Sequence, residues 1–239
     1  ELWNATTRRD TLHPQGILIS EATLGAIAVG MPAEIDAARL KIGRVTLRAG
    51  EPIGDPPLPR ADHSAVQENL PRLERALRLF GRSSTVRTTI LEGRDPETAT
   101  RITLMLNGGV SISVALLEPG GESPPSCLRP PLPAFPIGGG EGSTPAWDDF
   151  LAGVILADRL VDGGRIPSFL PDAIARRTTE LSAMQFTWAL EGRSALVIEE
   201  LLAALATRPV PTALLARCFG LGHSSGSDIV TGVHAALVA

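Results

Sequence analysis

Hydrophobic residues recur along this chain with two different spacings. In the first fifty residues, short apolar runs alternate with turn residues, which predicts strands at 16–20, 24–29 and 44–47. From residue 64 to residue 80 the spacing becomes helical, with Leu70, Leu73, Leu77 and Phe80 on one face and charged residues between them. The chain therefore begins as a β-rich unit and then turns helical.

The boundaries of this helix are marked by residue type. Asp62 suits an N-cap and Gly81 a helix end. Beyond this helix, the pattern predicts a strand at 86–91 and a helix at 95–106 that begins with Asp-Pro. The apolar residues 110–117 fit either a strand or a helix.

Residues 118–136 contain seven prolines, which is typical of a linker or surface excursion. Everything after it has helical patterning, in segments at 145–162, 168–191, 194–206, 210–219 and 226–238. We therefore predict an α+β fold, in which a β-rich N-terminal part precedes a mainly α-helical C-terminal domain. The expected division is 1–117, 118–136 and 137–239.

Composition excludes several classes of protein. The net charge is −4 and no block of Lys and Arg occurs, which argues against nucleic acid as a partner. No apolar run reaches 18 residues, so no membrane span is expected. The two cysteines form no disulfide framework, which favours a reducing, cytoplasmic location.

Two glycine-rich stretches resemble each other. Residues 138–153 and 220–232 each run from glycines through small hydroxyl residues to an Asp, with a glycine four residues beyond it. Glycine-rich loops that open helices present backbone N–H groups and a positive helix end, which suits an anion. We expect both loops to converge on one site, although capping two helices is the alternative role for such sequences.

The first loop offers Thr144 as N-cap and Pro145 as first helical residue, with Asp148 and Asp149 in the first turn. At a helix N-terminus the dipole should lower the carboxyl pKa values. In the second loop, Ser225 and Asp228 resemble a capping box. The other residues considered for binding or proton transfer here are Gly140, Gly142, Gly222, His223, Ser224 and Gly226.

Hydroxyl residues elsewhere are weaker indicators. Thr178 and Ser182 would share one face of a helix and reach a ligand, unless they bond their own backbone. Residues 83–89 resemble the phosphate loop of aspartate and ornithine carbamoyltransferases but lack its second arginine, so a strand or loop is expected there. Trp147 is expected in the core or at a pocket wall.

No metal motif is present. The four histidines lack zinc-binding spacing, so no metal site is predicted, and a magnesium ion on Asp148, Asp149 or Asp228 stays open as an alternative.

The two loops together resemble the signatures of the AllH-type subunit family, which is linked to bacterial oxamate carbamoyltransferase. The matching residues are Gly140-x-Gly142-x-Thr144-Pro145-x-x-Asp148-Asp149-Phe150-Leu151-Ala152-Gly153 in the first loop and Gly222-His223-Ser224-Ser225-Gly226-x-Asp228 in the second. The likeness covers roughly residues 137–239, and Thr178-Thr179-x-x-Ser182 also fits.

The resemblance implies a subunit of a multi-subunit enzyme in purine or allantoin nitrogen catabolism. Carbamoyl would move between phosphate and oxamate, with oxalurate as the carbamoylated acceptor. Asp149, Asp148 or His223 would then assist proton transfer, and the loops would bind the small anions. A non-catalytic assembly or regulatory subunit, and an acyl-phosphate or CoA-linked transferase, are the alternatives.

Overall fold

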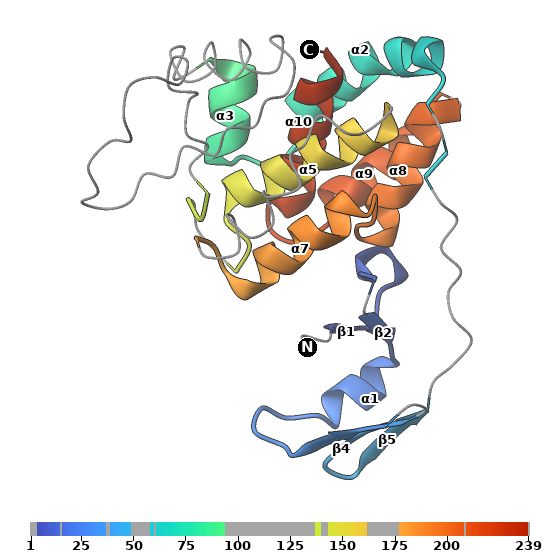
Figure 1. The fold of residues 1–239 in the computed structure, drawn as a ribbon, viewed down its shortest axis with the longest axis vertical. Coiled ribbons are helices and arrows are strands. Elements are labelled where there is room, and N and C mark those ends of the chain that lie inside the picture. The colour runs from blue at the N-terminus through green and yellow to red at the C-terminus, as the bar shows by residue number, and fades with distance from the viewer. Residues whose placement is uncertain are drawn as a thin grey trace, which may run out of the picture.

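A computed structural model describes residues 4–14, 16–36, 39–48, 58–59, 61–93, 137–139, 143–161, 177–207 and 209–238. Figure 1 shows a body of packed helices, with the strands β4 and β5 lying at the opposite end of the molecule from α2. This arrangement confirms the predicted α+β class.

The N-terminal part holds two small sheets. Strands β1 (Asn4–Thr6) and β2 (Gly16–Leu18) pair in parallel, with the short 3-10 helix η1 (Arg9–Thr11) between them. Strands β3 (Ala33–Ile35), β4 (Arg39–Ile42) and β5 (Val45–Arg48) form an antiparallel sheet in that order. The strands expected near 16–20 and 44–47 are confirmed.

The strand expected at 24–29 is wrong. Residues Glu21–Gly25 form helix α1, because the Ser20 side chain accepts a hydrogen bond from the Thr23 N–H and caps the first turn. The apolar run continues past the helix end, but its Val29 is fully exposed, so burial does not favour a strand there.

The N-terminal part attaches to the helices through residues around η1. The Leu196 N–H donates to the Leu12 carbonyl at 3.0 Å. The His13 ring stacks on Trp188 with centroids 5.5 Å apart, and burial lowers the pKa of His13 to about 4. An uncharged imidazole there packs as an apolar ring.

The helical part is made of seven described helices. They are α2 (His63–Phe80), α3 (Thr85–Glu92), α5 (Ala146–Leu160), α7 (Glu180–Leu190), α8 (Leu196–Thr207), α9 (Thr212–Phe219) and α10 (Ser225–Val238). The predicted cap at Asp62 and stop at Gly81 are both confirmed for α2. The segments expected at 145–162, 194–206, 210–219 and 226–238 match α5, α8, α9 and α10.

The strand expected at 86–91 is wrong, because these residues belong to α3. Ser84 caps that helix by accepting from the Arg87 N–H at 3.0 Å, and Gly93 ends it in the left-handed conformation. These end signals and the packing of Val86 in the core outweigh the β-branched composition of the segment.

Helix α5 lies at the centre of the body and crosses α10 (Figure 1). All its residues except Arg159 are buried. The crossing is very close: a Cβ on Gly153 would lie 2.0 Å from the Ile229 carbonyl oxygen, and one on Gly232 would lie 2.0 Å from the Phe150 carbonyl oxygen. The repeated glycine four residues beyond each Asp therefore lets the two backbones touch, in a nearly symmetric way.

Three expectations fall outside the described residues: the helix at 95–106, the segment at 110–117 and the proline-rich 118–136. The division into 1–117, 118–136 and 137–239 therefore stays a prediction. Within the described residues, none of the helices combines the length and the apolarity that a bilayer crossing requires.

Candidate functional site

The two glycine-rich loops meet in space. The Thr144 Oγ1 of the first loop lies 3.1 Å from the Ser225 Oγ of the second, so the two hydroxyls share a hydrogen bond. The crossing of α5 and α10 places Asp149 and Asp228 one turn before the two contact glycines. The predicted convergence of the loops is therefore confirmed.

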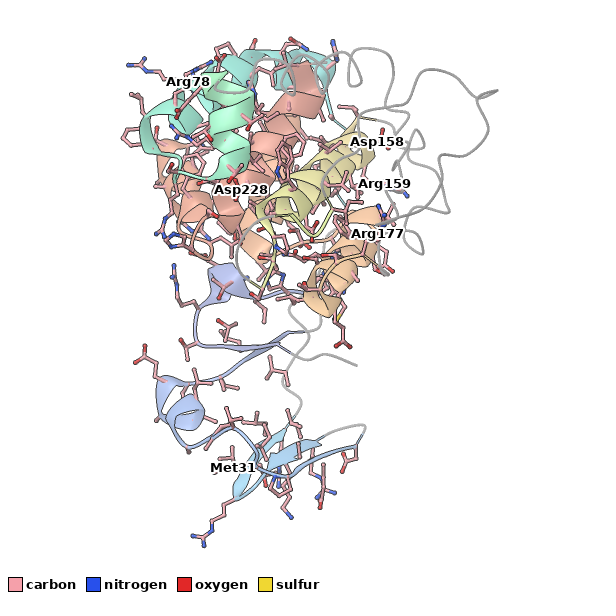
Figure 2. All side chains as sticks on the ribbon, turned by 90° about the vertical axis from the view of Figure 1, so that its left-hand side faces the viewer. Met31, Arg78, Asp158, Arg159, Arg177 and Asp228 are labelled. Carbon is pink, nitrogen blue, oxygen red and sulfur yellow. The ribbon has the colours of Figure 1, made fainter. Side chains whose placement is uncertain are left out.

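Two further helices begin at the same place. Ser84, the cap of α3, donates from its hydroxyl to the Asp228 Oδ1. Thr179, the cap of α7, donates to the Ser143 carbonyl at 2.7 Å. Figure 2 shows Asp228 where α3, α5 and α10 come together. Four helix N-termini thus surround the carboxylates, and their dipoles give the site a positive potential.

Asp149, like Asp148 and Asp228, is fully buried. Its side chain is 0% exposed, and neither carboxyl oxygen has a hydrogen-bond partner among the described residues. Burial raises its pKa to about 7, and the charge of Asp228 adds to this rise, while the polar groups of Ser225, Thr144 and Gln185 oppose it. Near neutral pH this carboxyl can therefore accept or release a proton.

Asp148 instead fastens the first loop. It accepts hydrogen bonds from the Gly138 N–H at 2.8 Å and from the Thr178 hydroxyl. Burial raises its pKa, although both hydrogen bonds and Ser182 act in the opposite direction. Gly138 has a φ of +73° and packs on the Arg177 carbonyl, where a side chain would not fit. This carboxylate holds the loop in position.

Asp228 connects the second loop to α3. Burial raises its pKa to about 6, against the hydroxyls of Ser84 and Ser224. Its Oδ1 accepts from Ser84, while its Oδ2 has no partner among the described residues. The backbone N–H of Arg82 donates to the Ser227 Oγ at 2.8 Å, which fixes the start of α3 against α10.

The expectation of lowered carboxyl pKa values is wrong for Asp148 and Asp149, and the pKa of Asp228 is raised as well. The helix dipole does favour the ionised form, but each carboxyl lies inside the protein, and loss of water outweighs the dipole.

The expected helix starts also need correction. Pro145, and not Thr144, is the N-cap of α5, with no side-chain cap, and the Thr144 hydroxyl faces Ser225. Ser225 is already the first residue of α10, so it does not form a capping box with Asp228. Thr178 precedes α7, so it does not share a helix face with Ser182.

The remaining predicted residues are spread around the loops. His223 is exposed, and its carbonyl accepts from the Arg82 guanidinium at 3.0 Å. Gly222 has a φ of +60° at the turn before α10, and Gly226 packs on the Cys218 carbonyl. Trp147 is in the core, in an edge-on contact with Phe150. Gly140 and Gly142 lie outside the described residues.

Three residues at the site were not expected from the sequence: Ser84, Arg82 and Gln185. Ser84 lies in the stretch 83–89 that resembles a phosphate loop, and its cap position was a signal that could have been used. Arg82 bonds the carbonyls of Gly222 and His223 in the second loop. Gln185 carries no motif, and only its position on α7 brings it to Asp149.

Unsatisfied polar atoms concentrate here. Six buried side-chain oxygen or nitrogen atoms lack a partner among the described residues, and five of them belong to Asp149 (two atoms), Ser182, Gln185 and Asp228. Such atoms are rare in proteins and call for a ligand, ion or water. No group of three or more His, Cys, Asp or Glu side chains that could hold a metal occurs among the described residues.

The comparisons agree with the sequence signatures. Residues 136–237 match a family described as oxamate carbamoyltransferase subunit AllH. No curated protein and no solved structure matches the chain.

Proposed function

We propose that the chain, whose residues 136–237 match the AllH family, binds a small anionic substrate of a carbamoyltransferase at the paired loops. The reaction would move a carbamoyl group between phosphate and oxamate, in a complex with partner subunits. The observation that carries this proposal is the buried, unpartnered Asp149 among four helix N-termini.

The helix ends supply the attraction for an anion. Oxamate and carbamoyl phosphate are small and negatively charged, and positive helix ends favour such ligands. Some loop amides are already used, since the Trp147 N–H donates to the Gly139 carbonyl and the Gly226 N–H to the Leu221 carbonyl. The binding energy therefore comes from helix dipoles and hydroxyl groups as well as from free amides.

Asp149 has the acidity that carbamoyl transfer needs. The amide nitrogen of oxamate forms a new C–N bond to the carbamoyl carbon, the bond from that carbon to the phosphate oxygen breaks, and the nitrogen loses a proton. A carboxylate with a pKa of about 7 accepts that proton far better than one with an ordinary pKa of 3.8. In the reverse direction the same group returns the proton.

Substrate must reach a side chain that has no exposed surface. Thr144 and Ser225 are both partly exposed, and their hydroxyls meet beside Asp149. We place the entry between them: the hydroxyl pair separates when substrate binds, and each hydroxyl then turns to the ligand.

The test measures carbamoyl transfer by the assembled complex with Asp149→Asn and Ser225→Ala. Loss of the base should lower kcat by at least about 100-fold, and loss of the hydroxyl should raise KM. Asp158→Asn is the matched control, because Asp158 is also buried (2% exposed) and lies further along the same helix.

Other outcomes would select other functions. Wild-type activity in both variants would leave the chain as a non-catalytic assembly or regulatory subunit whose loops only begin helices. Activity with another acyl donor, and none with carbamoyl phosphate, would place it in another transferase class. The proposed role of Asp149 fails in the first case, and the proposed donor fails in the second.

A further inference from the structure

We infer that Ser84 is a positioning residue of this site, which acts on Asp149 through Asp228. Its hydroxyl holds Asp228 in the charged form, and that charge makes the Asp149 carboxyl hold its proton more firmly. This inference rests on the proposed function, in which Asp149 transfers a proton. It also brings into the site a residue that precedes the matched residues 136–237.

The Ser84 hydroxyl makes two contacts at once. Its oxygen accepts from the Arg87 N–H at 3.0 Å, which caps α3, and its hydrogen is donated to the Asp228 Oδ1. A hydroxyl donor binds an ionised carboxylate more strongly than a neutral carboxyl group. The Ser84 hydroxyl therefore favours the ionised form of Asp228 and lowers its pKa, against the larger opposite effect of burial.

The two aspartates lie near each other because of the crossing of α5 and α10. The residue after each aspartate has its carbonyl against a glycine of the other helix: Ile229 against Gly153, and Phe150 against Gly232. Each aspartate is therefore within one turn of the point where the two backbones touch. No side chain separates the helices at that point, since both contact residues are glycines.

A charge on one of these carboxyls acts on the other because both are fully buried. Two like charges repel strongly away from water, so the group that ionises second keeps its proton to a higher pH. Burial raises the pKa of Asp149 to about 7, and the charge of Asp228 adds to this rise. Asp228 itself has a pKa of about 6, so it ionises first.

The other charged side chains on the surrounding helices are engaged elsewhere, exposed or distant. Arg82 donates to loop carbonyls, Asp148 accepts two hydrogen bonds, and Glu180 and His223 are exposed. Burial lowers the pKa of His234 on α10, which favours its neutral form. The others are the ion pairs Arg78–Glu74, Arg87–Glu92, Arg193–Glu199, Arg217–Asp10 and Arg217–Glu200, and Asp158 and Arg159 at the C-terminal end of α5.

The experiment follows the aspartate carboxyl carbons of the full chain by 13C NMR from about pH 4 to about pH 9. Asp149→Asn and Asp228→Asn assign the signals. In Ser84→Gly the titration midpoint of Asp228 should rise, and that of Asp149 should fall by at least about 0.5 pH unit. Glycine is nearly as good an N-cap as serine, so this variant removes the hydroxyl and keeps the start of α3.

Two variants serve as controls. Ser84→Thr retains both the cap and the hydroxyl donor, so both midpoints should stay as in the wild type. Ser64→Gly is the matched control, because the Ser64 hydroxyl also donates to an aspartate at a helix start, the exposed Asp62, at 2.8 Å. It should leave Asp149 unshifted. In the assembled complex, the pH at half-maximal kcat should fall in Ser84→Gly together with the Asp149 midpoint.

The outcomes separate this inference from the proposed function. An unshifted Asp149 in a folded Ser84→Gly would overturn the inference, and so would a wild-type chain in which Asp149 ionises before Asp228. Asp228→Asn removes the charge directly and should lower the Asp149 midpoint, so it tests the coupling even if Ser84→Gly does not fold. A complex without carbamoyl transfer would overturn the proposed function and leave the NMR result intact.

Discussion

Replacing Gly153 by alanine is expected to force α5 and α10 apart. The new Cβ would lie 2.0 Å from the Ile229 carbonyl oxygen and 3.0 Å from the Val233 backbone nitrogen. Both atoms belong to the backbone of α10, so no side-chain rotation relieves the overlap. The helices would have to separate by about 1.4 Å to restore ordinary van der Waals contact.

The loss in free energy of unfolding can be estimated from the close packing of the two helices. Inserting a methyl group costs about 1–3 kcal/mol, and a rigid backbone neighbour puts this case near 3 kcal/mol. Alanine recovers about 1 kcal/mol through its better helix propensity. The net loss is therefore about 2 kcal/mol, which for a chain of this length lowers Tm by roughly 4–8 °C.

Thermal unfolding followed by circular dichroism measures this loss, with Gly25→Ala as the matched control. Gly25 is also a helical glycine, but a Cβ there meets no described atom within 4 Å, so its Tm should stay the same or rise slightly. If Gly153→Ala melts with the wild type and the control, the close crossing is wrong.

Gly232 offers an internal check, because it meets the Phe150 carbonyl oxygen at the other half of the same crossing. One separation of the helices relieves both clashes. The double substitution Gly153→Ala with Gly232→Ala should therefore cost clearly less than the two single costs added. Simple additivity would show that the two contacts are independent.

Two further predictions concern buried polar groups. The pKa of Asp149 is raised from 3.8 to about 7, so the folded chain keeps a proton that the unfolded chain releases, and stability falls as pH rises from about 4 to about 7. Asp149→Asn should flatten the part of this fall between pH 5 and pH 8 by up to about 3 kcal/mol, with Asp148 and Asp228 still contributing. Urea unfolding at these two pH values measures the change, and an unchanged profile contradicts it. Asn69 accepts a hydrogen bond from the Val210 N–H at 2.9 Å inside the core. Asn69→Leu should therefore lower the free energy of unfolding by about 1–3 kcal/mol, while Gln67→Leu, at an exposed position, should hardly change it. Equal urea midpoints for the two variants would refute this difference.

The sequence was most informative where a pattern repeats. The matching order of glycine, hydroxyl and Asp in two stretches predicted that the two loops would converge, and the contact between Thr144 and Ser225 joins them. The glycines four residues beyond each Asp were also apparent in the sequence, but the reason for them, the close crossing of α5 and α10, is apparent only in the folded structure. From sequence alone, a glycine inside a helix indicates only lower helix stability. Its reason becomes clear when a neighbouring helix is found to pack its backbone directly against that glycine.

The acidity of the aspartates could not be predicted from local sequence. A helix N-terminus lowers a carboxyl pKa by a local effect. The sequence predicts this effect because it places Asp148 and Asp149 in the first turn of a helix. Burial depends on what packs around the helix, and here α7 and α10 arrive from distant parts of the chain. Burial by these distant helices has a larger effect than the helix dipole, so the pKa of Asp149 is raised and not lowered.

Short segments were misjudged for a related reason. Residues 86–91 are rich in β-branched side chains, yet Ser84 before them and Gly93 after them mark a helix. Only after α3 is in place does Ser84 reach Asp228, so its part in the site depends on contacts 144 residues apart. Gln185 has no such signal in its sequence at all.

The hydrogen bond between Thr144 and Ser225 joins residues 81 positions apart. During synthesis the ribosome therefore delivers the first loop long before the second. Until α10 docks, the Asp149 carboxyl stands in water with ordinary acidity. The raised pKa of Asp149 therefore develops only when this late helix packs against the earlier one.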